Sequence, residues 1–194
     1  MNSHDFSGVR EFSLEEGGRL FIAPTSAKDV VVVEGSVFGG PNLLPLDKDV
    51  IPALAAELLD AGTKKRNKKT LREDLAKRGA TLAFSAAGDR LQFSGRCFPE
   101  DLPTLLATIV ECLGEATFPN SEVENARAVM QGVLNDEQSE TLVQAERALA
   151  ALLYDPTHCN YLRSTAEELA SVASARRADL QDFRNLLGRG GLVL

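Results

Sequence analysis

The chain has 194 residues, of which 44% are apolar and 25% are charged, so it can form one domain or two small ones around a sizeable core. Its net charge of −7 argues against a general nucleic-acid or anionic-membrane surface, and no apolar run approaches the ~20 residues of a membrane span. The three cysteines have no repeated spacing and do not indicate a disulfide framework. We expect a soluble protein of the cytoplasm or the periplasm.

The first part of the chain predicts two strands and a helix. The strands cover Arg19–Pro24 and Val30–Phe38, and the continuous apolar run Val30–Val33 predicts that the second strand is buried on both faces. Apolar residues at helical spacing predict a helix over Asp47–Asp60. Gly62, just past the end of this helix, is a common stop signal.

A basic connector and a hairpin follow. The connector Gly62–Lys69 is interpreted as solvated, because the rest of the chain is acidic; contact with an acidic peptide or partner is the alternative. Thr70–Lys77 predicts a short helix. Ala80–Ala86 and Arg90–Cys97 then predict two strands joined by the turn Gly88–Asp89, which together form a β-hairpin.

The second half of the chain is predicted to be mostly helical. The expected segments are a helix over Pro99–Gly114, a long helical region from Pro119 to about Leu153 with a break near Glu137–Glu140, helices over Thr165–Val172 and Ala175–Leu187, and a strand that starts at Gly191–Leu194. Pairs of strands followed by helices predict an α+β domain, in which helices cover an antiparallel or mixed sheet.

Several short segments stand in an order that is typical of one known family. They are Leu14–Leu20, Leu58–Thr63, Gly79–Leu82, Ala116–Val129, Leu152–His158, Ala166–Leu169 and Leu180–Phe183. This ordered set resembles one repeat of the pitrilysin/insulinase zinc peptidases. The resemblance implies the metallohydrolase fold that pitrilysin-like and processing-peptidase proteins share, over residues 14–194, with residues 1–13 as an N-terminal extension. It also implies that the last strand continues and that a further helix follows, so we expect an incomplete domain.

The resemblance further implies a degenerate metal site. Active members of the family carry His-x-x-Glu-His on a helix, where both histidines hold zinc and the glutamate activates the bound water, and a distal glutamate completes the site. Aligned on Gly62, this chain has Ala53 and Glu57 at the two histidine positions, Ala56 at the glutamate position and Val133 at the distal position. Because one carboxylate beside alanines cannot hold a catalytic zinc, we expect no catalytic residue, metal or cofactor. An ordinary core helix is the alternative.

A strand beside that site has a second implied role. In active relatives the matching strand pairs with the substrate backbone, and Ala83 and Phe84 correspond to the pairing residues. Such pairing tolerates many sequences because it uses main-chain hydrogen bonds. An ordinary half-buried edge strand is the alternative interpretation of Ala80–Ala86.

The function that these features imply is that of a non-catalytic half or subunit of a bacterial zinc metalloendopeptidase assembly. Its partners would be a catalytic half of the same family and a peptide substrate, with no nucleic acid and no membrane span. The alternative is a scaffold or core subunit of a larger complex without a peptidase role, and an unrelated α+β binding domain is a third possibility. The incomplete domain also predicts self-association of this chain through an uncovered sheet edge.

Overall fold

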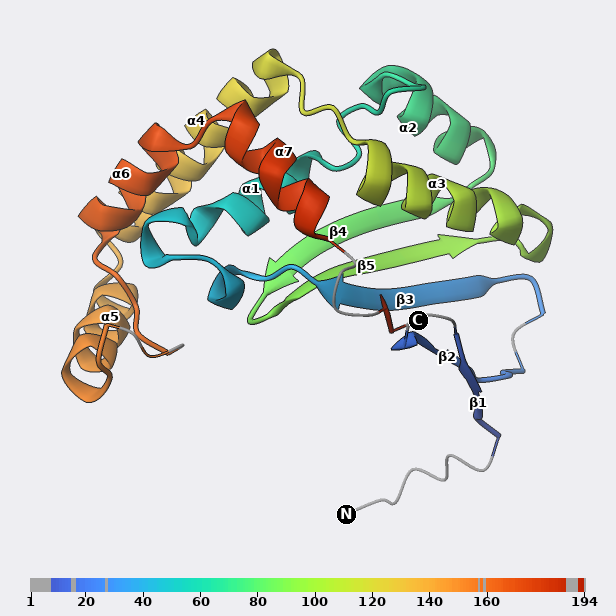
Figure 1. Ribbon diagram of the computed structural model, residues 1–194, viewed down its shortest axis with the longest axis horizontal. Coiled ribbons are helices and arrows are strands. Elements are labelled where there is room, and N and C mark those ends of the chain that lie inside the picture. The colour runs from blue at the N-terminus through green and yellow to red at the C-terminus, as the bar shows by residue number, and fades with distance from the viewer. Residues whose placement is uncertain are drawn as a thin grey trace.

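The computed structural model describes residues 8–14, 17–26, 28–156, 158, 160–187 and 192–193 (Figure 1). It is an α+β fold in which helices gather over one face of a six-stranded sheet (Figure 1). The predicted fold class, with a mixed sheet, is therefore confirmed. Most of the predicted N-terminal extension, residues 1–7, and the first and last residues of the predicted final strand, Gly191 and Leu194, lie outside the described residues.

The strands are arranged in the order β1-β2-β6-β3-β5-β4. Their bounds are β1 Arg10–Ser13, β2 Arg19–Ile22, β3 Val31–Phe38, β4 Thr81–Ala87, β5 Arg90–Cys97 and β6 Leu192–Val193. Neighbouring strands are antiparallel except β2 and β6, which are parallel. The strand β1 lies within the segment that the resemblance left outside the domain. The strand β4 lies at one end of the sheet, so one of its edges faces no other strand among the described residues.

Seven α-helices complete the part of the chain that the structure describes. They are α1 Val50–Leu58, α2 Lys68–Lys77, α3 Leu102–Glu115, α4 Asn120–Glu137, α5 Thr141–Leu153, α6 Thr165–Ser174 and α7 Arg177–Leu186. The predicted break near Glu137–Glu140 is confirmed, because α4 ends at Glu137 and α5 begins at Thr141. Short 3-10 turns cover Pro41–Leu43, Leu46–Lys48 and Pro99–Asp101. No helix of the described residues has the length and apolarity that crossing a bilayer requires.

The apolar run of the second predicted strand is buried on one face only, so the prediction of burial on both faces is wrong. In β3 the side chain of Val33 is 7% exposed, whereas that of Val32 is 61% exposed. Successive side chains of a strand point to opposite faces of the sheet. Since the helices cover one face of the sheet, Val33 reaches the core. Val32 points to the uncovered face, where its side chain stays largely exposed to solvent.

The helix α1 sits at the centre of the main core. Leu54 and Leu58 are 1% and 3% exposed, and they belong to the same buried cluster as Leu91 of the sheet and Phe183 of α7. Burying a leucine side chain stabilises a fold by about 2 kcal/mol. Contacts with β4, α4 and α7 thus fix the position of α1 from three sides.

A buried ion pair also holds the start of α1. The Arg163 guanidinium donates to the Asp49 carboxylate at 2.5 and 3.1 Å and to the Ser171 hydroxyl at 2.8 Å. Burial raises the pKa of Asp49, and the Arg163 charge opposes that increase without cancelling it. Because Asp49 directly precedes α1 and Arg163 directly precedes the capping residue Ser164 of α6, the pair ties the two helix beginnings together.

Candidate functional site

The three α1 residues that the sequence assigns to a degenerate metal site face a common hollow. Ala53 and Glu57 are four residues apart on α1, so they lie on one face of the helix, and Ala56 is next to them. All three line a hollow of about 570 Å³. Ala56 is 4% exposed and Glu57 is exposed. Together with the core residues Leu54 and Leu58, they form the α1 wall of the hollow.

Three other elements supply the remaining walls. The edge strand β4 contributes Phe84, and the helices α2 and α4 close two further sides. The lining residues from these elements are Lys68 and Arg72 of α2, Phe84, Ser85 and Ala86 of β4, and Glu122, Asn125, Ala126, Val129 and Met130 of α4. The walls are thus mostly small or apolar, with both cations on α2 and one carboxylate on each of α1 and α4.

Val133, the residue assigned to the distal ligand position, does not line this hollow. It lies on α4 one turn beyond Val129 and is 53% exposed. Residues four apart share a face of a helix, so Val133 lies on the same side of α4 as Val129 but further along its axis. Sequence reasoning did not single out Ala126 or Met130, which do reach the hollow. The structure therefore brings Ala53, Ala56, Glu57 and Phe84 together, without Val133.

The charged groups in the hollow differ in whether they are paired. Lys68 forms an ion pair with Glu122 at 2.5 Å, and Arg72 forms a longer one with Asp60 at 3.7 Å. Glu57 has no ion pair or hydrogen bond to any described residue. It is therefore the one charged lining residue whose charge the described part of the chain leaves uncompensated.

The donor set of the hollow does not fit a zinc ion. A catalytic zinc takes three protein ligands from histidine, cysteine and carboxylate groups. The lining residues offer two carboxylates, Glu57 and Glu122, and the second is engaged by Lys68. Across the described residues, no group of three or more His, Cys, Asp or Glu side chains is placed to hold a metal. The described lining is therefore apolar with two carboxylates and two cations, and it lacks the imidazole and thiolate ligands of a catalytic zinc.

Ala83 and Phe84, the two residues assigned to peptide pairing, point to opposite faces of the sheet. Leu82, Phe84 and Ala86 are half-buried against the α1 core, whereas Ala83 and Ser85 are exposed on the uncovered face. On that face a second hollow, of about 440 Å³, is lined by Glu34, Gly35, Ser36, Ala83, Phe84, Ser85, Gln92, Phe93 and Ser94. The free edge of β4 thus runs between two hollows, one under the helices and one on the open face.

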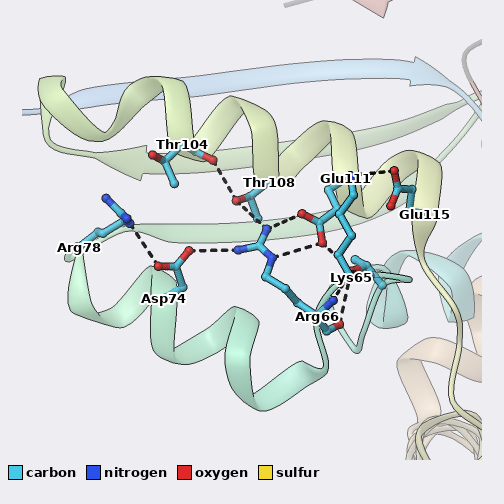
Figure 2. A network of polar contacts seen from close by, with 9 residues as sticks. Lys65, Arg66, Asp74, Arg78, Thr104, Thr108, Glu111 and Glu115 are labelled. Carbon is cyan, nitrogen blue, oxygen red and sulfur yellow. Dashed lines mark hydrogen bonds and ion pairs between the residues drawn. The ribbon is translucent and has the colours of Figure 1, made fainter.

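A polar network around Arg66 fixes α2 (Figure 2). This helix carries the two cations of the first hollow, Lys68 and Arg72. The Arg66 guanidinium donates to Glu111 at 2.7 and 3.2 Å, to Asp74 at 3.0 Å and to the Thr108 hydroxyl at 3.2 Å. Asp74 in turn accepts from Arg78 at 3.3 Å. Because Arg66 directly precedes the N-cap residue of α2, these bonds hold the beginning of α2 against α3.

The electrostatics of the network favour its charged form. Burial works to raise the pKa of Glu111, but hydrogen bonds from Arg66 and Thr63 outweigh it, so the pKa of Glu111 lies below its ordinary value. Hydrogen bonding to Glu111 raises the pKa of Arg66. The side chains of Arg66 and Glu111 are 21% and 11% exposed.

The prediction that the connector Gly62–Lys69 is solvated is correct for Lys69, whose side chain is 83% exposed, and wrong for Arg66.

Comparisons with known proteins bear on the family and the fold of the chain. The family model "Insulinase (Peptidase family M16)" matches residues 54–165, which run from α1 to the start of α6. The chain is similar to the mitochondrial-processing peptidase subunit beta of Bos taurus, with 24% identity over 128 residues, which are 63% of this chain and 24% of that protein. The chain therefore spans about a quarter of the length of this relative.

Solved structures share the fold at low identity. The peptidase M16 inactive domain from Pseudomonas fluorescens superposes with a TM-score of 0.79 and 18% identity, over 95% of this chain and 46% of that one. The periplasmic protease PqqL from Escherichia coli superposes with a TM-score of 0.77 and 14% identity, over 96% of this chain and 21% of that one. At these identities the superpositions establish the fold alone, and this chain covers less than half of each of the two structures.

Proposed function

Because this chain belongs to the insulinase family of peptidases (family M16), we propose that it is a non-catalytic half or subunit of a zinc metallopeptidase assembly. In this role it pairs with a catalytic half and forms part of the chamber that holds the peptide. The observation that carries the proposal is the hollow beside α1, which is lined by Ala53, Ala56 and Glu57, the residues that the sequence resemblance aligns with the metal-site positions of active members.

In this proposal, peptide hydrolysis takes place on the catalytic partner and not in this hollow. Peptide hydrolysis by this family depends on a zinc-bound water that a glutamate activates. The lining residues of this hollow provide neither the ligands nor a glutamate at the position of Ala56. A partner with an intact His-x-x-Glu-His would supply both, on the same polypeptide or on another.

Two of the similar proteins support a paired arrangement. The bovine relative is named as a subunit, and the Pseudomonas structure is described as an inactive domain. This chain spans 24% and 46% of those two proteins, so each contains room for further domains. The pairing of this chain with a catalytic half follows the same pattern.

The free edge of β4 is the part of this chain that we assign to the peptide. An edge strand presents unpaired N–H and C=O groups that a peptide in extended conformation can use. The edge lies beside α1, and the adjacent residues Ala83, Ser85 and Ala86 have small side chains that leave room for a neighbouring strand. The chain can therefore orient a peptide without reacting with it.

Self-association of the isolated chain remains a prediction. Besides β4, the strand β3 pairs with β6 only at Ser36 and Val37, so Val31–Gly35 face no strand on that side among the described residues. The helix α5 also projects from the body of the fold with exposed leucines, of which Leu152 is 85% exposed (Figure 1). Light scattering at increasing concentration should show dimers or larger species, and a monodisperse monomer at all concentrations would contradict this expectation.

Purification with the natural partners tests the proposed function. The protein, tagged in its own host, should co-purify with a family member that carries His-x-x-Glu-His, in a fixed ratio by mass spectrometry. Adding the chain to that member should increase chelator-sensitive cleavage of a quenched peptide, whereas the chain alone should not cleave it. Co-purification with a large complex that lacks such a member would support the scaffold function instead, and zinc-dependent cleavage by the chain alone would overturn both.

A further inference from the structure

The hollow beside α1 has the composition of a pocket for a long basic side chain. Lysine and arginine combine an apolar stem with a cationic tip, so they bind best where apolar walls end at an anionic group. The apolar part of the walls consists of Ala53, Leu54, Ala56, Leu58, Phe84, Ala86, Ala126, Val129 and Met130. Glu57 stands among them, and no described residue compensates its charge.

The remaining charges in the hollow do not compete for that tip. The Lys68 ammonium is already bound to Glu122 at 2.5 Å, and the Arg72 guanidinium lies 3.7 Å from Asp60. Both cations therefore have carboxylate partners of their own, on the α2 side of the hollow. An entering cation gains the uncompensated Glu57, whereas an entering carboxylate meets Glu57 as a like charge.

The edge strand sets the register in which such a side chain would enter. A peptide strand that adds to β4 lies ~4.8 Å away and sends alternate side chains to opposite faces of the sheet. The peptide residue opposite Phe84 points to the same face as Phe84, which is the face covered by α1. Its neighbours along the peptide point to the open face, where Ala83 and Ser85 are small. The side chain of one peptide residue is therefore directed to the hollow. The pocket does not restrict which side chains the neighbouring peptide residues carry.

We infer that the hollow of α1, β4 and α4 is a side-chain pocket for a lysine or arginine of an extended peptide paired with the free edge of β4, with Glu57 as the residue that selects the positive charge. The inference rests on the proposed function, because it needs a peptide at β4, and it goes further by naming the class of residue that the peptide presents. Charge complementarity with Glu57 identifies the occupant as a basic peptide.

A titration followed by NMR tests the pocket directly. Three nine-residue peptides of high β-propensity are compared, identical except for a central Arg, Met or Glu. The Arg peptide should bind most tightly, by up to about fivefold over the Met peptide, as expected for one partly solvated ion pair. The amide signals that move should be those of β4 near Phe84 and of α1 near Glu57.

Charge variants separate the pocket from general electrostatic attraction. Glu57→Gln should abolish the preference for the Arg peptide, and Glu57→Lys should reverse it in favour of the Glu peptide. Glu34→Gln is the matched control, because it removes the same charge from the opposite face of the sheet and should leave the preference unchanged. Both glutamates are exposed, and circular dichroism checks that the variants fold.

The outcomes separate the inference from the function on which it rests. If all three peptides bind at β4 with equal affinity, or if Glu34→Gln lowers the preference as much as Glu57→Gln, the pocket is wrong while peptide pairing stands. If no peptide binds, or if the shifts lie away from β4, peptide pairing itself is wrong and the pocket fails with it.

Discussion

The two sides of α2 differ in one charged group. On the side of α3, Arg66 is surrounded by Asp74, Glu111 and Thr108, and its hydrogen bonds are all 3.2 Å or shorter (Figure 2). On the side of α1, Glu57 stands in a hollow without a partner among the described residues. A charge that is both buried and paired holds elements together, whereas an exposed and unpaired one is free to meet a ligand. The first region is therefore structural, and the second is where we place binding.

We expect the largest change in the free energy of unfolding from a substitution of Glu111. Glu111→Ala leaves the Arg66 guanidinium, 21% exposed, without its main partner, so the free energy of unfolding should fall by about 3 kcal/mol. Urea unfolding followed by circular dichroism measures the loss. The double variant Arg66→Met/Glu111→Leu removes both charges and should lose no more than about 1 kcal/mol. A single variant as stable as the natural chain would show that the network is not a structural clamp.

A restored metal site tests the other region. The triple variant Ala53→His/Ala56→Glu/Glu57→His places two imidazoles four residues apart on α1 and should bind one zinc ion, as measured by isothermal titration calorimetry. If the sequence register is right, adding Val133→Glu should raise the affinity at least about tenfold. Met130→Glu is the matched comparison, because Met130 lines the hollow and Val133 does not. A larger gain from Met130→Glu would show that the assignment of the distal position to Val133 is wrong.

Acid should weaken the polar network around Glu111. The ionised Glu111 has a lowered pKa in the folded chain, so its contribution is present above the ordinary carboxyl pKa of ~4.3 and is lost as the pH falls through the lower folded value. The free energy of unfolding should therefore fall more steeply between about pH 5 and pH 3 in the natural chain than in Arg66→Met/Glu111→Leu. Urea unfolding at several pH values measures both slopes, and equal slopes would remove Glu111 from the acid response.

The smallest effect is expected at Glu57. Glu57→Gln removes an exposed charge that has no partner among the described residues, so the free energy of unfolding should change by less than about 0.5 kcal/mol. Glu111→Gln, the same substitution in the network, should cost several times more. Urea unfolding of the two variants side by side makes the measurement. A large loss at Glu57 would mean that this residue supports the fold, and its assignment to ligand binding would lose its basis.

The hairpin and the long helices could be predicted from the sequence because their signals are local. Arg90–Cys97 was predicted at the bounds that β5 has, and the break after Glu137 separates α4 from α5 as expected. The segments that match the insulinase family also stand in the sequence itself. Turn residues and apolar periodicity depend on a few neighbouring residues along the chain. They therefore predict an element without knowledge of its tertiary contacts.

The candidate site was predicted in part. The sequence placed Ala53, Ala56 and Glu57 on one helix beside the strand that carries Phe84, and all four line the hollow. It did not identify Met130 or the pairing of Lys68 with Glu122. The choice between Met130 and Val133 depends on how α4 crosses α1, and a shift of one turn moves a side chain by about 5.4 Å along the helix axis.

The sequence by itself determined the family, the order of the elements after β1 and the presence at positions 53 and 56 of alanine, which cannot bind a metal through its side chain. The tertiary structure decided which side of β3 is buried, that Arg66 is paired while its neighbour Lys69 is solvated, and that β4 lies at a free edge next to the hollow. The physical reason is the distance along the chain. Arg66 meets Glu111 across 45 residues, and no local pattern encodes a partner so far away, because only the packing of α2 on α3 brings the two charges together.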